Sequence, residues 1–291
     1  MSDQASIPVA LKKRLQASPL IHADYRHAAE RWVLYSTLIT LTTVLIVGGF
    51  FSAGTMAGAI LIVLLVSFIK NRYTMQRYVK QGRLVTAETH PELWRIFQET
   101  RQLVPVPANT ELYVQDSHKL NAYAIGAMRP YKIIINSVLL DYFNENELKS
   151  IIGHELGHIR FGHTSWALVT GVFEGQAHGF LILGVLIRFV FLFYSRLCEN
   201  SADRAGLVAC GNLRDAVSAE LKLNLAGHNP SPALIEKFSH IQSSPDDSLM
   251  EDMGELASTH PTMKGRIRSL LRFAQSPAWQ AHAKAVSSAR I

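Results

Sequence analysis

The stretch IIGHELGHIRFGH, residues 151–163, carries the side chains best suited to chemistry in this chain. His154 and His158 are four residues apart, so on a helix their imidazoles project from one face, which is the spacing that two zinc ligands need. Glu155 lies beside them, where its carboxylate can take a proton from a water molecule. The pattern therefore predicts a site for one zinc ion with a carboxylate base.

The surrounding residues predict a helix from about 145 to about 162. Asn144 is a good N-cap and Glu147 follows three residues later, which is the pattern of a capping box. Gly153 and Gly157 each cost a helix about 1 kcal/mol relative to alanine, so we expect another element to approach this helix closely there. Apolar residues recur at three- and four-residue steps and predict one buried stripe: Leu148, Ile151, Ile152, Leu156 and Ile159.

A catalytic zinc usually has three protein ligands, so the two histidines leave one position to fill. Glu199, in CENSADRAG, is the favoured candidate because Asp203 follows one helical turn later. There the aspartate can accept the second N–H of a ligating histidine and fix its tautomer. His163, at the end of the predicted helix, and Glu174, in a glycine-rich connection, are the weaker alternatives.

Residues 32–69 contain no charged residue and no histidine. A single helix of that length would be about 57 Å long, nearly twice the thickness of a bilayer core. The run must therefore turn, and GGFFSAGTMAG, residues 48–58, supplies the turn residues. We predict two transmembrane helices, at about 32–50 and 54–70. Residues 164–195 form a second apolar region, which we expect to be a buried or interfacial helix, with a third membrane element as the alternative.

Basic residues flank the predicted hairpin on both sides, and its turn carries no charge. Positively charged flanks stay on the cytoplasmic side, so both ends, and the metal helix, are expected in the cytoplasm at a bacterial inner membrane. Cys198 and Cys210, on one helix about 18 Å apart, are expected to be buried free thiols. The flanking basic residues are Lys12, Lys13, Arg14, Arg26 and Arg31 before the hairpin, and Lys70, Arg72, Arg77, Lys80 and Arg83 after it.

The 291-residue chain is 48% hydrophobic, enough for one sizeable core plus membrane segments. We predict an α+β fold that is mainly helical. Its net charge of +6 comes from basic residues near apolar segments, so nucleic-acid binding is not expected. Helical periodicity marks residues 88–104 and the segment from Pro261 to Ala274, and short β-type runs lie at 111–115, 120–126 and 131–136, the last two predicted to pair as a hairpin.

Four segments in a fixed order carry a family resemblance: NAYAIG, HELGH, ENSAD and STHPTMKGRIRSL. Together they resemble the HtpX-type membrane zinc metalloendopeptidases, the family that also holds the CAAX prenyl protease and the Oma-type proteases. The resemblance covers roughly residues 85–272 and the N-terminal hairpin. It implies a zincin domain of gluzincin type with a small edge-stranded sheet, in which His154, His158 and Glu199 bind zinc, Glu155 is the base and Asp203 supports a ligand.

The resemblance also implies roles for residues that spacing alone leaves open. NAYAIG is similar to the family's edge strand, along which substrate backbone is aligned, which makes Asn121, Ala122 and Tyr123 substrate-binding residues. His260 matches a histidine near the metal that stabilises the transition state or caps the resting zinc. Arg266 matches an arginine of unclear role.

These features predict a membrane-anchored zinc endopeptidase that hydrolyses extended or unfolded segments of membrane proteins, in quality control or processing. Polypeptide substrates and the lipid bilayer are the expected partners, and the oligomeric state is open. The alternative is a catalytically inactive, zinc-bound membrane adaptor or chaperone, although such a protein has no need of Glu155. A structural zinc site in a transporter-like protein would need more spans and a fourth protein ligand, such as His260.

The expected organisation is a cytoplasmic segment (1–31), a transmembrane hairpin (32–70), a zinc metallopeptidase domain (71–274) and a C-terminal tail that frays (275–291).

Overall fold

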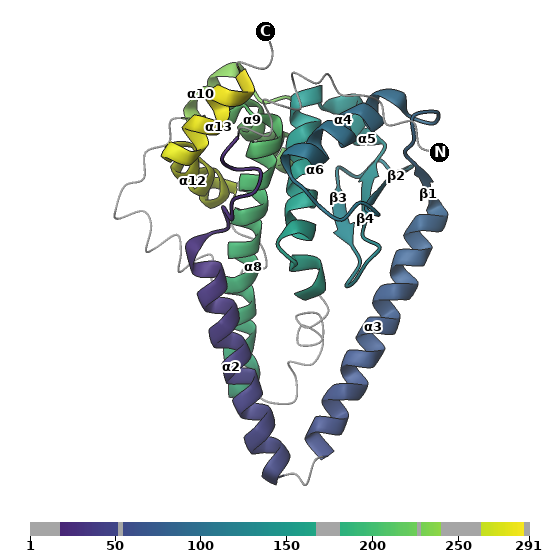
Figure 1. The fold of residues 1–291 in the computed structure, drawn as a ribbon, viewed down its shortest axis with the longest axis vertical. Coiled ribbons are helices and arrows are strands. Elements are labelled where there is room, and N and C mark those ends of the chain that lie inside the picture. The colour runs from purple at the N-terminus through teal and green to yellow at the C-terminus, as the bar shows by residue number, and fades with distance from the viewer. Residues whose placement is uncertain (1–17, 52–54, 167–180, 226–227, 240–262, 288–291) are drawn as a thin grey trace.

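A computed structural model of the chain describes residues 18–51, 55–166, 181–225, 228–239 and 263–287. Helices dominate, and a small mixed sheet lies beside them, which confirms the predicted class (Figure 1). The helices are α2 (Ala28–Phe51), α3 (Thr55–Gln81), α4 (Pro91–Leu103), α5 (Val138–Tyr142), α6 (Glu145–Arg160), α8 (Leu181–Cys210), α9 (Leu213–Asn224), α10 (Pro232–Ser239), α12 (Met263–Ala274) and α13 (Pro277–Ser287). The strands are β1 (Gly82–Leu84), β2 (Glu111–Gln115), β3 (Ala122–Ile125) and β4 (Lys132–Asn136).

The strands form one sheet in the order β1-β2-β4-β3. The predicted hairpin is confirmed, since β3 pairs antiparallel with β4, with Tyr123 opposite Ile134. The central pair, β2 and β4, is parallel, and β1 adds an antiparallel strand beyond β2. β3 is therefore an edge strand, and its outer side faces α6 and the cavity described below.

The helix that carries the histidine pair begins where the sequence predicts. The Asn144 side chain accepts the Glu147 N–H at 3.0 Å, and the Glu147 carboxylate accepts the Asn144 N–H at 2.9 Å. This capping box satisfies two backbone donors that the first helical turn leaves without partners. Buried Glu147 also accepts from Lys222 of α9 at 2.7 Å, so the cap ties α6 to a second helix. α6 ends at Arg160, two residues before the predicted end.

The close neighbour that the glycines of α6 lead us to expect is α8. A Cβ atom built on Gly153 would lie 2.3 Å from the Cβ of Ala209, and one on Gly157 would lie 2.7 Å from the Cβ of Ala205. Carbon atoms make favourable contact at about 3.5–4.0 Å, so no larger residue fits without moving one of the helices. The two glycines therefore set how closely the two central helices approach.

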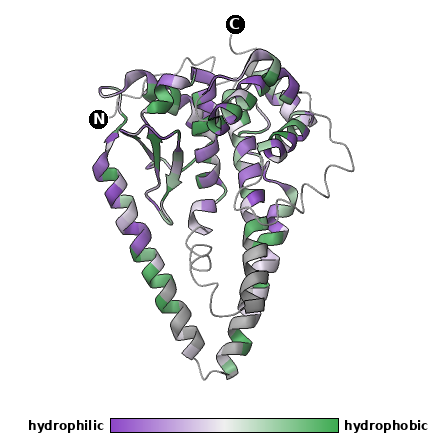
Figure 2. Ribbon diagram, turned by 180° about the vertical axis from the view of Figure 1, so that it is seen from behind, coloured by the Kyte–Doolittle hydropathy of each residue, from purple (hydrophilic) through white to green (hydrophobic). Residues whose placement is uncertain are grey.

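α2 and α3 project beyond the body as two arms that meet at their far ends (Figure 1). Hydrophobic residues lie along both arms (Figure 2). Within the residues that the structure describes, however, no helix is both long enough and apolar enough to cross a membrane. The predicted hairpin thus forms as two helices, but its two transmembrane spans are not confirmed. Large exposed apolar side chains on the arms include Trp32, Ile39, Ile46, Leu61, Ile62, Leu65 and Ile69.

Both ends of the described chain pack more firmly than predicted. Leu20 and Tyr25, in the expected N-terminal segment, are buried in the main core. The prediction that the C-terminal stretch frays is wrong for residues 277–287, because they form α13. On that helix Trp279 is buried, and His282 hydrogen-bonds to Ser18 and to the carbonyl of Val208. Two ring side chains three residues apart make a short buried stripe, which the small and polar residues around them concealed.

The remaining predictions about α8 are settled in part. Cys198 and Cys210 both lie on this helix, and both are buried and free, as predicted. Residues 167–180 of the second apolar region are outside the described residues. In the described part of that region, Leu192 and Tyr194 are buried whereas Phe193 is exposed.

Replacing Gly153 by alanine tests the close approach of α6 and α8. Alanine favours a helix by about 1 kcal/mol over glycine, but here the new methyl group would overlap Ala209. We expect Gly153→Ala to lower the free energy of unfolding by about 1–3 kcal/mol, measured by urea denaturation. The control is Gly58→Ala on α3, where nothing lies within 4 Å of the added atom, and we expect it to be neutral or stabilising. Equal effects of the two changes would contradict this account of the packing.

Candidate metal centre

Three side chains that could bind a metal converge between α6 and α8. The Nε2 atoms of His154 and His158 are 3.0 Å apart, and they lie 3.6 Å from Oε2 and Oε1 of Glu199, respectively. Tetrahedral zinc with bonds of about 2.0–2.1 Å separates neighbouring ligand atoms by about 3.3–3.4 Å. The donor types and their spacing therefore fit a single divalent ion. The structure brings these three predicted ligands together, and their role as ligands stays a prediction.

Asp203 orients the first histidine of the pair. Its Oδ1 lies 2.9 Å from His154 Nδ1, so the carboxylate can accept the N–H there and leave Nε2 free. Arg266 of α12 donates two hydrogen bonds to the same carboxylate, from Nε at 2.9 Å and from Nη2 at 2.5 Å. A two-pronged contact of this kind fixes direction as well as position. The described contacts thus give Arg266, which had no clear role from the sequence, a place behind the site.

Arg266 also contacts a carboxylate that the sequence analysis missed. Its Nη1 lies 3.0 Å from Oε1 of Glu220 on α9, and its Nη2 lies 3.8 Å from Oε2 of Glu199. Burial raises the pKa of the Glu220 carboxyl. Glu220 carries no motif, and on an amphipathic helix it reads as an ordinary surface residue, so only its three-dimensional neighbours identify it.

The surroundings of the histidine pair favour a positive charge on one ring only. Burial acts to lower the pKa of His154, but the Asp203 hydrogen bond and nearby carboxylates outweigh it and raise that pKa to about 9. Burial, with His154 and His163 nearby, lowers the pKa of His158. Burial also opposes ionisation of Asp203, yet the Arg266 guanidinium holds its pKa well below the usual range. The negative charges of Asp203, Glu199 and Glu155 favour a proton on His154, and a bound cation would take the place of that proton.

Glu155 lies beside the three candidate ligands and is itself buried. Burial raises the pKa of its carboxyl to about 7, with the charge of Glu199 adding to the effect and His154 opposing it. A hydrogen bond from the backbone of Ala124, on β3, also opposes the rise. A carboxyl whose pKa lies near neutral pH can both accept and release a proton, which suits a general base.

A cavity of about 680 Å³ opens onto these residues, and β3 forms one wall. The three predicted substrate residues line it, but they are oriented differently. The carbonyl of Asn121 accepts from the Asn136 N–H at 3.1 Å, inside the sheet. Tyr123 donates from its hydroxyl to Gln115 at 2.9 Å. Along an antiparallel strand, residues whose backbone groups pair with the neighbouring strand alternate with residues whose backbone groups point away from it. In β3 the backbone groups that point away from β4 are those of Ala122 and Ala124.

Of the alternative ligands, His163 lies within the described residues, and it does not face the point shared by His154, His158 and Glu199. His163 contacts the opposite nitrogen of His158, Nδ1, at 2.9 Å. Glu174 and His260 lie outside the described residues, so their predicted roles stay predictions.

Two imidazoles and a carboxylate lie around one point, with a further buried carboxylate in the same cavity, and these are the side-chain types that metal-dependent hydrolases use. Residues 87–274 match the model of Peptidase family M48, and the chain belongs to that family. The resemblance to HtpX-type proteases is confirmed.

Several curated relatives are proteases. Protease HtpX of Xanthomonas campestris is 24% identical over 249 residues, which cover 73% of this chain and 82% of that protein. The Protease HtpX homolog of Pyrococcus furiosus is 24% identical over 84% of this chain and 96% of its own length. The plastoglobule-localized metallopeptidase 48 of Arabidopsis thaliana is 31% identical over 157 residues, and the match spans only 44% of that longer protein. Among solved structures, Ste24p of S. mikatae aligns with a TM-score of 0.40 and 15% identity, over 89% of this chain and 80% of that one.

Proposed function

We propose that this chain is a zinc-dependent endopeptidase of the gluzincin type, with residues 71–274 as its catalytic domain. His154, His158 and Glu199 would hold the metal, and Glu155 would act as the base. The observation that carries the proposal is the convergence of three side chains, with contacts of 3.0–3.6 Å between the two histidine Nε2 atoms and from each of them to one oxygen of Glu199. Membership of a peptidase family supports it independently.

The residues around the centre have distinct tasks in peptide hydrolysis. A zinc ion held there would act as a Lewis acid on the scissile carbonyl and lower the pKa of a water molecule to about 7. Glu155 accepts a proton from the attacking water and passes it to the nitrogen of the leaving amine. Asp203 holds His154 in the tautomer whose Nε2 is free, and Arg266 holds Asp203.

Substrate would bind as an added strand along β3. The outward backbone groups of Ala122 and the outward carbonyl of Ala124 can pair with an extended peptide, since the inner groups of this strand already pair with β4 and the Ala124 N–H donates to Glu155. The hydrogen bond from the Ala124 backbone to Glu155 places this edge next to the proposed base. Because backbone groups are alike in every residue, such binding selects extended or unfolded segments and imposes little sequence preference.

We further propose that the two arms associate with a lipid bilayer, at a bacterial inner membrane with the body on the cytoplasmic side. The many large exposed apolar side chains of α2 and α3 support this proposal, because extensive exposed apolar surface is uncommon on monomeric proteins in water. Basic residues lie where the arms meet the body, including Arg31, Arg72 and Arg77, where anionic headgroups would attract them. The cavity would then act on segments of membrane proteins.

Charges placed on the arms test the proposed contact with lipid. The double variant Ile46→Glu/Leu61→Glu puts one carboxylate on each arm, at side chains that are 67% exposed in both cases. We expect it to weaken co-flotation with phosphatidylglycerol-containing vesicles at least about tenfold, because burying a charge in lipid is costly. Tyr142→Glu, at an exposed position on the body, is the control and should float as the unaltered protein does. Equal flotation of both variants would count against the arms as the lipid contact.

Removing the proposed base tests the chemistry. Glu155→Gln keeps the shape of the side chain but cannot accept a proton, so we expect kcat for a loosely folded protein substrate to fall by about 100-fold or more. Bound zinc, measured by atomic absorption, should remain near one ion per chain. The exposed Glu92→Gln on α4 is the matched control and should retain activity. Undiminished cleavage by Glu155→Gln would end the proposal of a carboxylate base.

Two proline substitutions one residue apart test strand addition. Ala122→Pro removes an outward N–H, so we expect a higher KM for peptide substrates with little loss of stability. Tyr123→Pro removes an N–H directed at β4, so we expect a lower melting temperature. Thermal unfolding and steady-state kinetics on both variants separate the two effects. An unchanged KM in folded Ala122→Pro would argue against β3 as the binding edge.

A further inference from the structure

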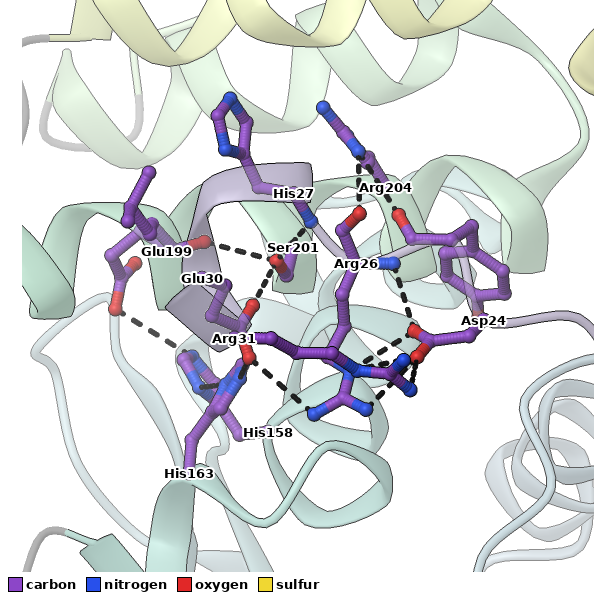
Figure 3. A network of polar contacts seen from close by, with 12 residues as sticks. Asp24, Arg26, His27, Glu30, Arg31, His158, His163, Glu199, Ser201 and Arg204 are labelled. Carbon is purple, nitrogen blue, oxygen red and sulfur yellow. Dashed lines mark hydrogen bonds and ion pairs between the residues drawn. The ribbon is translucent and has the colours of Figure 1, made fainter. Parts of the chain in front are cut away.

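Two buried side chains beside the candidate centre, His163 and Glu30, have no part in the function proposed above. The Nδ1 atoms of His158 and His163 are 2.9 Å apart, and His163 Nε2 lies 3.1 Å from Glu30 Oε1. Glu30 is only 1% exposed and comes from the first turn of α2, 133 residues before His163. Figure 3 shows the Glu30 carboxylate between His163 and Ser201 of α8. A carboxylate buried this deeply is costly unless partners compensate it.

The Glu30 carboxylate determines which ring nitrogens of His163 and His158 carry a proton. An ionised carboxylate can only accept hydrogen bonds, so the neutral His163 ring must carry its proton on Nε2 and accept at Nδ1. His158 must then donate from Nδ1, which leaves its Nε2 without a proton. That nitrogen is the one directed at His154 and Glu199. The series of contacts therefore prepares His158 to bind a cation.

We propose that Glu30, acting through His163, is a positioning residue for the metal ligand His158. This inference rests on the proposed zinc site. Ligating histidines almost always donate their second N–H to a carboxylate, a carbonyl or water, and that partner fixes the ring and its tautomer. His154 has Asp203 as its direct partner. His158 is connected to the Glu30 carboxylate through the imidazole of His163, so a carboxylate lies behind each of the two proposed ligand histidines.

The partners of Glu30 show how its charge is held in place. Its Oε2 accepts the hydroxyl proton of Ser201, whose oxygen also accepts the backbone N–H of His27 at 2.9 Å. The guanidinium of Arg26 lies 3.8 Å from Oε1 and offsets the negative charge. These contacts join the beginning of α2 to α8 at the level of the centre. Glu30 lies outside the residues 87–274 that match the family model, so a segment beyond the matched region completes this centre.

A rival explanation is a second metal ion bound by Glu30, His163 and Cys198. Their potential ligand atoms all lie within 4.8 Å of one another. One observation opposes it: burial raises the pKa of the Cys198 thiol, which disfavours the thiolate that a metal needs. The rival predicts two zinc ions per chain, whereas the positioning role predicts one.

The test is the zinc affinity of the full-length protein, measured by competition with a chromophoric chelator. We expect Glu30→Gln and His163→Leu each to weaken zinc binding by about 10–100-fold, as changes behind a metal ligand do. His163→Gln keeps one acceptor and one donor, so it should retain affinity within about threefold. Asp24→Asn removes a nearby carboxylate that contacts arginines, and it is the matched control with unchanged affinity.

The double variant Glu30→Gln/His163→Leu distinguishes positioning from general destabilisation. Because Glu30 acts through His163, the double variant should bind zinc no more weakly than His163→Leu alone. Additive losses, an unchanged affinity in folded Glu30→Gln, or two zinc ions per chain would overturn the inference while leaving the proposed function intact. Should Glu30→Gln fail to fold, equal affinities of His163→Gln and His163→Leu would overturn it. Absence of zinc binding by the unaltered protein would overturn the proposed function and this inference together.

Discussion

The close approach of α6 and α8 is the constraint on which the centre depends. Glutamate is a short side chain, so Glu199 can reach both ring nitrogens only if its helix lies nearly against the helix of His154 and His158. Packed helix axes usually lie about 8–10 Å apart, according to the side chains between them. Here glycine occupies the contact on both sides: a Cβ on Gly206 of α8 would lie 2.7 Å from the backbone oxygen of Ser150. The helix-destabilising glycines are therefore part of the architecture of the site.

A second level of organisation is the pairing of buried charges around that contact. Arg266 lies among three acids, Asp203, Glu220 and Glu199, and draws α12 and α9 against α8. Buried charges are tolerated when they are paired and hydrogen-bonded. Among the described residues, the guanidinium of Arg266 faces three carboxylates, and the raised pKa of His154 is consistent with an excess of negative charge around it. Such a field suits a cationic ligand.

The cavity joins this charged interior to a sheet edge. β3 is held on its inner side by β4, and its outer edge lies beside Glu155, which accepts the backbone N–H of Ala124. An edge strand is ordinarily a hazard, because it invites pairing with another chain. In the function proposed above, the same property would hold substrate. The arms and the body also meet here, since α2 contributes Glu30 to the surroundings of the centre before it leaves the body.

Local patterns in the sequence determined the parts of this protein that depend on near neighbours in the chain. The capping box at Asn144, the periodicity of α6, and the spacing of His154, Glu155 and His158 all follow from residues within a few turns. The turn signal between β3 and β4 likewise lies between the two strands it joins. The pairing of Glu199 with Asp203 was also local, since both lie on one turn of α8.

Tertiary structure alone decided the contacts between residues distant in the chain. No sequence pattern near Glu30 or Glu220 indicates that either lies beside the centre, and the spacing of His163 does not reveal that it contacts Nδ1 of His158. The buried stripe of α13 was hidden for a related reason, because the surface that covers it comes from the N-terminal segment and α8. The transmembrane prediction rested on composition and was not confirmed by the described helices. Hydrogen-bond partners and burial depend on which surfaces meet, and that is set by the packing of the whole chain.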